Sequence, residues 1–191
     1  MSSISIAGDT SGAVTLAAPA IAGTNTMTLL AATGSLGPKV LSTAVASTSG
    51  TSIDFTGIPS WVVRITVILN NVSVSSTNPM KIQLGTSSGV DATTYTTTST
   101  SFGSTTGATT SYTDGFYIRN FVTTDAVGGT VVFVNISGNI WVGNGCYATT
   151  VGTATGTTGG TKTLSGTLDR VRLTINGTDT FDSGSVNILY E

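Results

Sequence analysis

The chain has 191 residues, of which only 8% are charged against about 25% in an average soluble domain, and its formal net charge is −2. Its seven basic residues are scattered and form no stripe that could neutralise a phosphate backbone, so we expect neither nucleic acid nor an acidic lipid surface as a partner. Histidine, the commonest general base and transition-metal ligand, is absent, and we expect no cofactor.

The composition favours β-structure. Thr, Val, Ile and the aromatic residues prefer strands, and the 24 glycines together with Ser and Asn supply turns. Glu, Lys and Arg, which cover the surfaces of helical proteins, are scarce. The length suits one all-β domain, or one such domain with a small appendage.

The first 37 residues differ from the rest of the chain. They contain no aromatic residue and a single charge, Asp9, and the segment VTLAA at 14–18 recurs as MTLLAA at 27–32. Such a segment has too little apolar surface to form its own core, so it must be disordered, pack along copies of itself or lie on a neighbouring subunit. We expect an extended arm at 1–37 that packs against other subunits or virion proteins, and a globular domain at 38–191. No signal peptide and no membrane-spanning run are expected.

The strongest strand pattern lies between residues 57 and 85. Side chains of one parity in the predicted strand 61–74 are apolar and point to a core, and this set is Trp61, Val63, Ile65, Val67 and Leu69. After Asn70 and Asn71 the apolar parity shifts to Val72 and Val74, which predicts a bulge or tight turn at the two asparagines. Pro79 precedes a second strand at 80–84.

Turn residues separate further apolar segments at the spacing of a β-sandwich. We expect strands at 40–46, 52–55, 61–74, 80–84, 116–122, 129–136, 139–147, 168–175 and 183–190. The Thr-rich passages 91–113 and 151–163 are expected to be loops. The predicted fold is therefore an antiparallel, jelly-roll-like β-sandwich of about eight to ten strands.

Aromatic residues are the best candidates for ligand contact in such a domain. Tyr95, Phe102 and Tyr112 lie in the predicted loop 91–113, where we expect them to pin the loop, with ligand contact as the alternative. For stacking on a sugar ring the candidates are Trp141, Asn144, Tyr147 and Tyr112, with core packing as the alternative for each. Trp61 is expected to be structural.

The residues of ordinary catalytic chemistry are few. Cys146 is expected to be a small buried hydrophobe, because no His or basic cluster accompanies it in the sequence. Asp169, Asp179 and Asp182 could supply a carboxylate pair for a glycosidase or oxygen ligands for an ion, but turn residues of this kind usually bond their own backbone. We expect no enzyme activity and no metal site, and whether the three aspartates bind an ion stays open.

Three stretches together resemble the C-terminal domains of bacteriophage tail fibres and related minor virion proteins. They are TSGAVTLAAPAIAGTNTMTLLAATGSL at 10–36, FTGIPSWVVRITVILNNVSVSSTNPMKIQLGTSSGV at 55–90, and LDRVRLTINGTDTFDSGSVNILYE at 168–191. The resemblance implies a homotrimeric, all-β virion appendage that contacts the host surface, and it supplies no catalytic or ligand residues.

The expected function is that of a non-enzymatic virion protein, made in the host cytoplasm, whose fibre or tip attaches to a host-surface receptor such as a glycan. Exposed hydroxyls and amides suit sugar recognition. One alternative is a capsid decoration or cement protein, whose arm would bind the shell. A second alternative is a free carbohydrate-binding module, which would not need the arm.

Overall fold

The computed structural model describes residues 3–7, 13–17, 37–103, 107–118, 125–150 and 154–191, and every regular element among them is a β-strand. None of these residues forms a helix that could span a bilayer. The chain divides into two units, Met1–Leu36 and Gly37–Glu191. In the first, β1 (Ser3–Ala7) pairs antiparallel with β2 (Ala13–Ala17), whereas the second copy of the repeat, at 27–32, lies outside the described residues.

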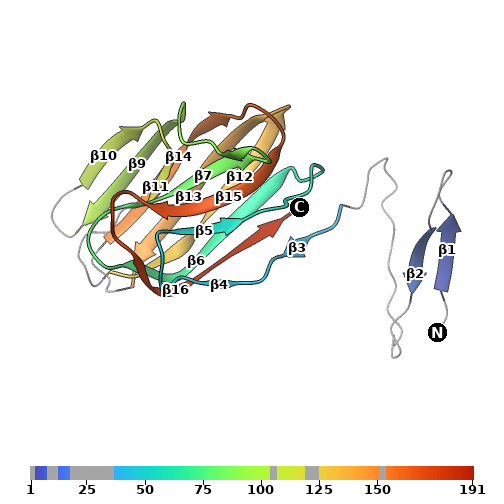
Figure 1. Ribbon diagram of the computed structural model, residues 1–191, viewed down its shortest axis with the longest axis horizontal. Coiled ribbons are helices and arrows are strands. Elements are labelled where there is room, and N and C mark those ends of the chain that lie inside the picture. The colour runs from blue at the N-terminus through green and yellow to red at the C-terminus, as the bar shows by residue number, and fades with distance from the viewer. Residues whose placement is uncertain (1–2, 8–12, 18–36, 104–106, 119–124, 151–153) are drawn as a thin grey trace. The chain divides into compact units, whose positions relative to one another are not determined.

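The second unit contains two antiparallel sheets, which Figure 1 shows lying one in front of the other. The larger sheet has nine strands in the order β10-β9-β14-β13-β12-β6-β16-β3, with β4 also paired to β16. Its strands are β3 (Val40–Leu41), β4 (Val45–Ala46), β6 (Arg64–Val74), β9 (Thr96–Gly103), β10 (Gly107–Tyr112), β12 (Val127–Ser137), β13 (Ile140–Thr149), β14 (Ala154–Thr163) and β16 (Phe181–Tyr190).

The smaller sheet has five strands in the order β11-β7-β15-β5, with β8 paired to β7. Its strands are β5 (Ser52–Phe55), β7 (Met80–Thr86), β8 (Gly89–Val90), β11 (Phe116–Ile118) and β15 (Leu168–Ile175). The predicted all-β, antiparallel and sandwich-like fold is confirmed, while a jelly-roll connectivity stays a prediction.

Aromatic rings join the two sheets in the core. The ring of Phe116, on the smaller sheet, meets that of Phe133, on the larger sheet, edge to face at 4.9 Å, and also contacts Tyr95 at 5.8 Å. All three side chains are almost fully buried. The rings of Phe116 and Phe133 also cover Gly143, where an added Cβ would lie 2.6 Å from Phe133 and 2.7 Å from Phe116. Gly143 is thus required by the packing of the core.

The predicted irregularity at Asn70 and Asn71 is a β-bulge. The register of β6 shifts by one residue there against both of its neighbours, β12 and β16, and Asn71 has a φ of 51°. Against β16 a second shift, between Ser183 and Phe181, restores the earlier register. Val72 and Val74 therefore face the same core as Ile65 and the other inward residues of β6. The extra residue lets an 11-residue strand keep one face buried along its whole length.

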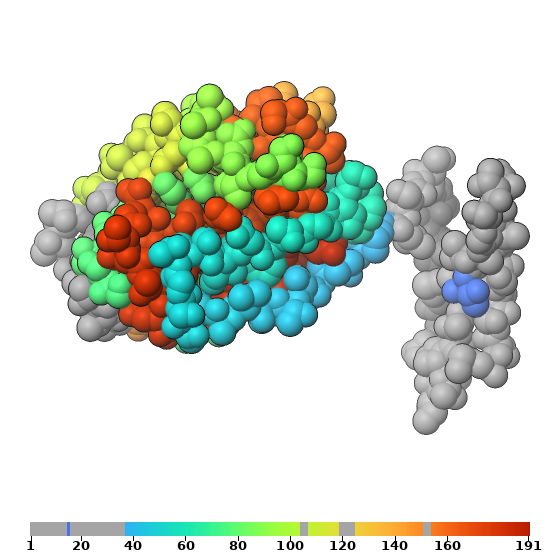
Figure 2. Space-filling view, viewed as in Figure 1, coloured from blue at the N-terminus to red at the C-terminus, as the bar shows by residue number. Residues whose placement is uncertain are grey.

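The start of this strand differs from the prediction. Trp61 and Val63 are 43% and 57% exposed, because the regular strand begins only at Arg64 and these two residues lie before it, at the end of the sandwich. Trp61 instead contacts Tyr190, with ring centroids 5.9 Å apart. The predicted strand at 40–46 is also interrupted, and Figure 2 shows this segment in light blue beside the C-terminal residues in red.

The two Thr-rich passages predicted as loops are largely strands. β9 and β10 lie within 91–113, and β14 occupies most of 151–163. Their inward positions are polar. Thr97 and Ser99 can be buried at such positions because their hydroxyls donate to backbone carbonyls, which offsets the cost of removing them from water. The alternation of apolar and polar residues that marks most strands is therefore missing from these sequences.

Candidate functional site

The outward side of the larger sheet carries a regular set of hydroxyl groups, which we call the hydroxyl face. It comprises Thr96, Thr98 and Thr100 of β9, Thr109 and Ser111 of β10, and Thr155, Thr157, Thr161 and Thr163 of β14. The pairing places Thr157, Thr100 and Thr109 side by side on adjacent strands, and the hydroxyls of Thr100 and Thr109 are 3.1 Å apart. The only charged residue in these three strands is Lys162, whose side chain is 0% exposed.

The same side of the sheet becomes apolar on the neighbouring strands. We call this region the apolar patch. It comprises Val134, Ile136, Ile140 and Val142 on β12 and β13, and, across β6, Leu189 and Leu41 on β16 and β3. Ile136 is 61% exposed and Leu41 is 60% exposed. Arg64 lies beside Val134 in the pairing and forms an ion pair with Glu191 at 2.9 Å. One sheet therefore presents two chemically different surfaces.

The structure separates the four residues predicted to contact a ligand. Trp141 and Tyr147 are both 3% exposed and belong to the core, in agreement with the alternative given for them. Asn144, on the same strand but of opposite parity, is exposed on the outward side between the apolar patch and the hydroxyl face. Tyr112 stacks on Tyr117, with centroids 3.6 Å apart and planes inclined by 7°. Only Asn144 is thus available at this surface.

The aromatic residues of the passage 91–113 have different roles. Tyr95 pins the chain as expected: its buried hydroxyl donates to the carbonyl of Asp91 at 2.8 Å and accepts from the amide of Leu84 at 2.8 Å. Burial raises the pKa of Tyr95, so it stays protonated. Phe102, by contrast, is 54% exposed and lies at the end of the hydroxyl face.

The prediction that Cys146 is buried is wrong. Its thiol is free and exposed, because Cys146 shares the outward parity of Asn144 on β13 and pairs with Thr157 of the hydroxyl face. The position of a residue along a strand decides which side of the sheet its side chain occupies. The residues next to Cys146 in the sequence did not indicate that its side chain is on the outward side.

A buried lysine lies beneath the hydroxyl face. The ammonium of Lys162 is 2.7 Å from the Asp91 carboxylate, and it donates to the Thr93 carbonyl at 2.6 Å and the Thr94 hydroxyl at 2.8 Å. It also lies 4.7 Å from the ring centre of Tyr95. Every proton of the ammonium has a partner, so Lys162 holds the chain before β9 in place, a role that the sequence pattern did not predict.

The three aspartates near the C-terminus do not form one site. Asp169 is at the start of β15 and pairs with Arg170, whereas Asp179 and Asp182 lie beyond the other end of that strand. Asp182 accepts a hydrogen bond from Ser73. Among the described residues, no group of three or more His, Cys, Asp or Glu side chains is arranged to hold a metal ion.

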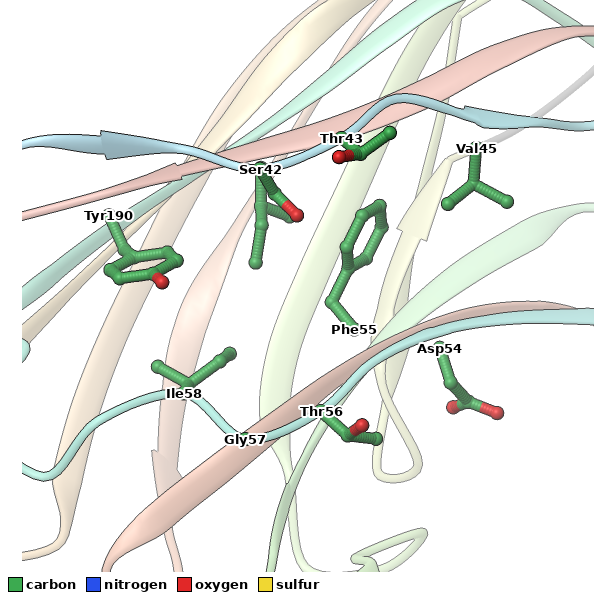
Figure 3. A pocket seen from close by; sticks show the side chains of 10 residues that line it. Ser42, Thr43, Val45, Asp54, Phe55, Thr56, Gly57, Ile58 and Tyr190 are labelled. Carbon is green, nitrogen blue, oxygen red and sulfur yellow. The ribbon is translucent and has the colours of Figure 1, made fainter.

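A pocket of about 280 Å³ lies between the edges of the two sheets, as Figure 3 shows. Ser42, Thr43 and Tyr190 form one wall and Thr56 and Ile58 the other, and the ring of Phe55 projects between them. The pocket's one carboxylate, Asp54, forms a bidentate ion pair with Arg172 at 2.7 and 2.8 Å. Both oxygens of the Asp54 carboxylate are therefore engaged by one guanidinium.

Two further pockets have similar chemistry. One, of about 320 Å³, lies beside β8 and contains a single carboxylate, Asp91, which is engaged by Lys162. The other, of about 270 Å³, contains Asn135, Asn139 and the edge of Trp141, and no titratable group lines it. None of these pockets brings two carboxylates together.

No protein-family model, curated protein or solved structure matches the chain. The function proposed below therefore depends on the chain's own residues and surfaces.

Proposed function

We propose that this chain is a non-enzymatic structural protein of a bacteriophage virion, a tail fibre or fibre tip that attaches to the host-cell surface. The observation that carries the proposal is the hydroxyl face, a broad surface with many hydrogen-bonding groups and no charged side chain on the described residues of β9, β10 and β14 other than the buried Lys162. Such a surface suits contact with an uncharged, hydroxyl-rich receptor.

Two further features support an attached module over a free binding domain. Residues 1–36 form a separate unit, as an arm that binds other virion proteins would. The carboxylates of Asp54 and Asp91 in the pockets are paired with Arg172 and Lys162, so neither is poised for hydrolysis. Binding and assembly are the roles that these surfaces favour.

Electron microscopy of virions labelled with an antibody against residues 38–191 tests this proposal. We expect label on the tail, and we expect the purified chain to bind cells that the phage infects. Label on capsid faces with a bare tail, together with no affinity for cells, would overturn the proposal and favour the decoration protein instead.

The proposal includes a homotrimer, and the apolar patch is the surface that supports self-association. Leaving Val134, Ile136 and Ile140 in water is unfavourable, and a second copy would cover them. Substituting both Val134 and Ile140 with Asp is expected to weaken assembly by about a hundredfold or more, because carboxylates would be buried at the interface. Sedimentation velocity measures this change as a loss of the trimer.

The matched control is Thr157→Asp, which adds a carboxylate on the same side of the sheet but within the hydroxyl face. It is expected to leave the trimer intact. A trimer that persists in the Val134→Asp, Ile140→Asp variant with unchanged affinity would show that the apolar patch is not the interface.

A further inference from the structure

Among the described residues, Phe102 is the one large apolar side chain at the end of the hydroxyl face. It is 54% exposed, and the pairing places it between Thr155 of β14 and Gly107 of β10. An added Cβ on Gly107 would lie 2.9 and 3.1 Å from two carbons of the Phe102 ring, so the ring covers the glycine. A glycine at this position lets an aromatic ring lie against the sheet with its outer side in solvent.

The hydroxyls beside this ring form a repeating pattern. Neighbouring strands in a sheet are about 4.8 Å apart, and side chains of one parity follow one another at about 6.7 Å along a strand. Thr96, Thr98 and Thr100 precede Phe102 at this repeat on β9, and the threonines of β14 run alongside. The surface therefore offers donors and acceptors over a distance of several residues, next to one apolar platform.

We propose that Phe102 and the hydroxyl face bind a chain of neutral sugars, with the ring of Phe102 stacked on the C–H face of one pyranose. This proposal rests on the proposed function and names the receptor class and the surface that contacts it. Aromatic rings attract C–H groups to their negative faces, and threonine hydroxyls both donate to and accept from sugar hydroxyls. A polymer fits better than a single sugar because the surface is open and none of the three pockets described above includes Phe102.

The near absence of charge on the hydroxyl face predicts that its ligand is uncharged. The strands β9, β10 and β14 carry no acidic residue, and their one cation, Lys162, is buried and paired with Asp91. An anionic polysaccharide would find no exposed cation there, and burying its carboxylates against threonines would be unfavourable. We therefore expect discrimination against anionic glycans.

The experiment measures binding of the full chain to immobilised dextran, mannan and galactan and to anionic polygalacturonate. We expect binding to at least one neutral polysaccharide and none to polygalacturonate. Phe102→Ala should weaken the binding about tenfold or more, while Phe102→Trp should keep it within about threefold. The matched control is Trp61→Ala, which removes another exposed aromatic ring from the end of the sandwich and should leave the affinity unchanged.

The exposed Cys146 provides a second readout in the unmodified protein. Because it pairs with Thr157 on the outward side of the sheet, a polysaccharide bound to the hydroxyl face should slow its reaction with iodoacetamide several-fold. Circular dichroism and thermal unfolding of each variant establish that it is folded, and no loss of structure is expected at the exposed Phe102.

Either of two results would overturn this inference: no binding to any of the three neutral polysaccharides, or equal affinities of the wild-type and Phe102→Ala proteins. Cell attachment that survives Phe102→Ala would reject the surface while leaving the attachment function in place. Antibody label confined to the capsid, with Phe102-dependent polysaccharide binding retained, would reject the fibre role and support the sugar surface.

Discussion

Asp91→Ala is expected to lower the free energy of unfolding by about 3–5 kcal/mol. The substitution removes the counter-charge of Lys162, whose ammonium is completely buried and cannot regain its hydration. Lys162→Met should be less costly, about 2–3 kcal/mol, because the Asp91 carboxylate left behind is 24% exposed and can be solvated. Urea unfolding followed by tryptophan fluorescence measures both values.

The double variant Asp91→Ala, Lys162→Met distinguishes the loss of the Asp91–Lys162 ion pair from a simple loss of packing. If the cost of Asp91→Ala comes from the uncompensated cation, adding Lys162→Met should restore much of the stability, so that the double variant resembles Lys162→Met alone. Strictly additive effects, with the double variant the least stable, would contradict the role assigned to the ion pair.

The Asp91–Lys162 ion pair should also make the free energy of unfolding depend on pH in a defined way. Burial raises the pKa of Asp91, but hydrogen bonds from Lys162 and the Thr93 amide, together with the charge of Lys162, outweigh it and leave the pKa below its ordinary value of 3.8. The stability contributed by the carboxylate is therefore fully present above pH 3.8 and is lost as the pH falls through the lowered pKa. The difference between wild type and Asp91→Ala should therefore shrink as the pH falls below about 4.

Glu191 does not disturb this comparison. A hydrogen bond from Lys39 and the charges of Lys39 and Arg64 lower its pKa, so it too contributes stability that is lost in acid. This contribution is common to wild type and Asp91→Ala, and it cancels in the difference.

Gly184→Ala is expected to destabilise the fold by about 2–4 kcal/mol. Gly184 lies on β16 opposite the bulge at Asn71, with a φ of +94°, and an added Cβ would lie 2.2 Å from the carbonyl oxygen of Asn71. Backbone strain and a clash with the backbone of β6 act together, and neither is relieved by rotating a side chain. Thermal and urea unfolding give the change in stability.

Gly128→Ala is the matched control for this prediction. Gly128 lies opposite the same bulge on the other neighbour of β6, but no atom lies within 4 Å of an added Cβ. This variant should range from neutral to about 1 kcal/mol more stable, since alanine restricts the unfolded chain. Similar losses at Gly128 and Gly184 would show that the bulge does not depend on the glycine of β16.

Part of this fold could be predicted from the sequence because its signals are local. The strands at 52–55 and 168–175 have the predicted bounds, and the parity shift at Asn70 and Asn71 marked the bulge. Each of these depends on alternating aliphatic residues and turn dipeptides, which a strand imposes on its own sequence. The all-β class follows from the same patterns.

The candidate surface could not be predicted in the same way. The strands that carry it bury Thr97, Ser99 and Ser101 in place of aliphatic residues, so their sequences look like loops. Thr96, Thr98 and Thr100 alternate with these buried residues, but a run of Thr and Ser has no visible parity. Phe102 was recognised as an isolated aromatic, and only the pairing with Gly107 and Thr155 places it on an exposed surface.

By itself the sequence determined the fold class, the strands with aliphatic cores and the scarcity of charge, because these depend on composition and on neighbours within one strand. The tertiary structure decided which side of each strand faces solvent and which distant groups meet. It buried Trp141 and Tyr147, exposed Cys146 and brought Lys162 to Asp91, 71 positions apart in the chain. Such contacts depend on the register between strands, which backbone hydrogen bonds and core packing set together across the whole sheet.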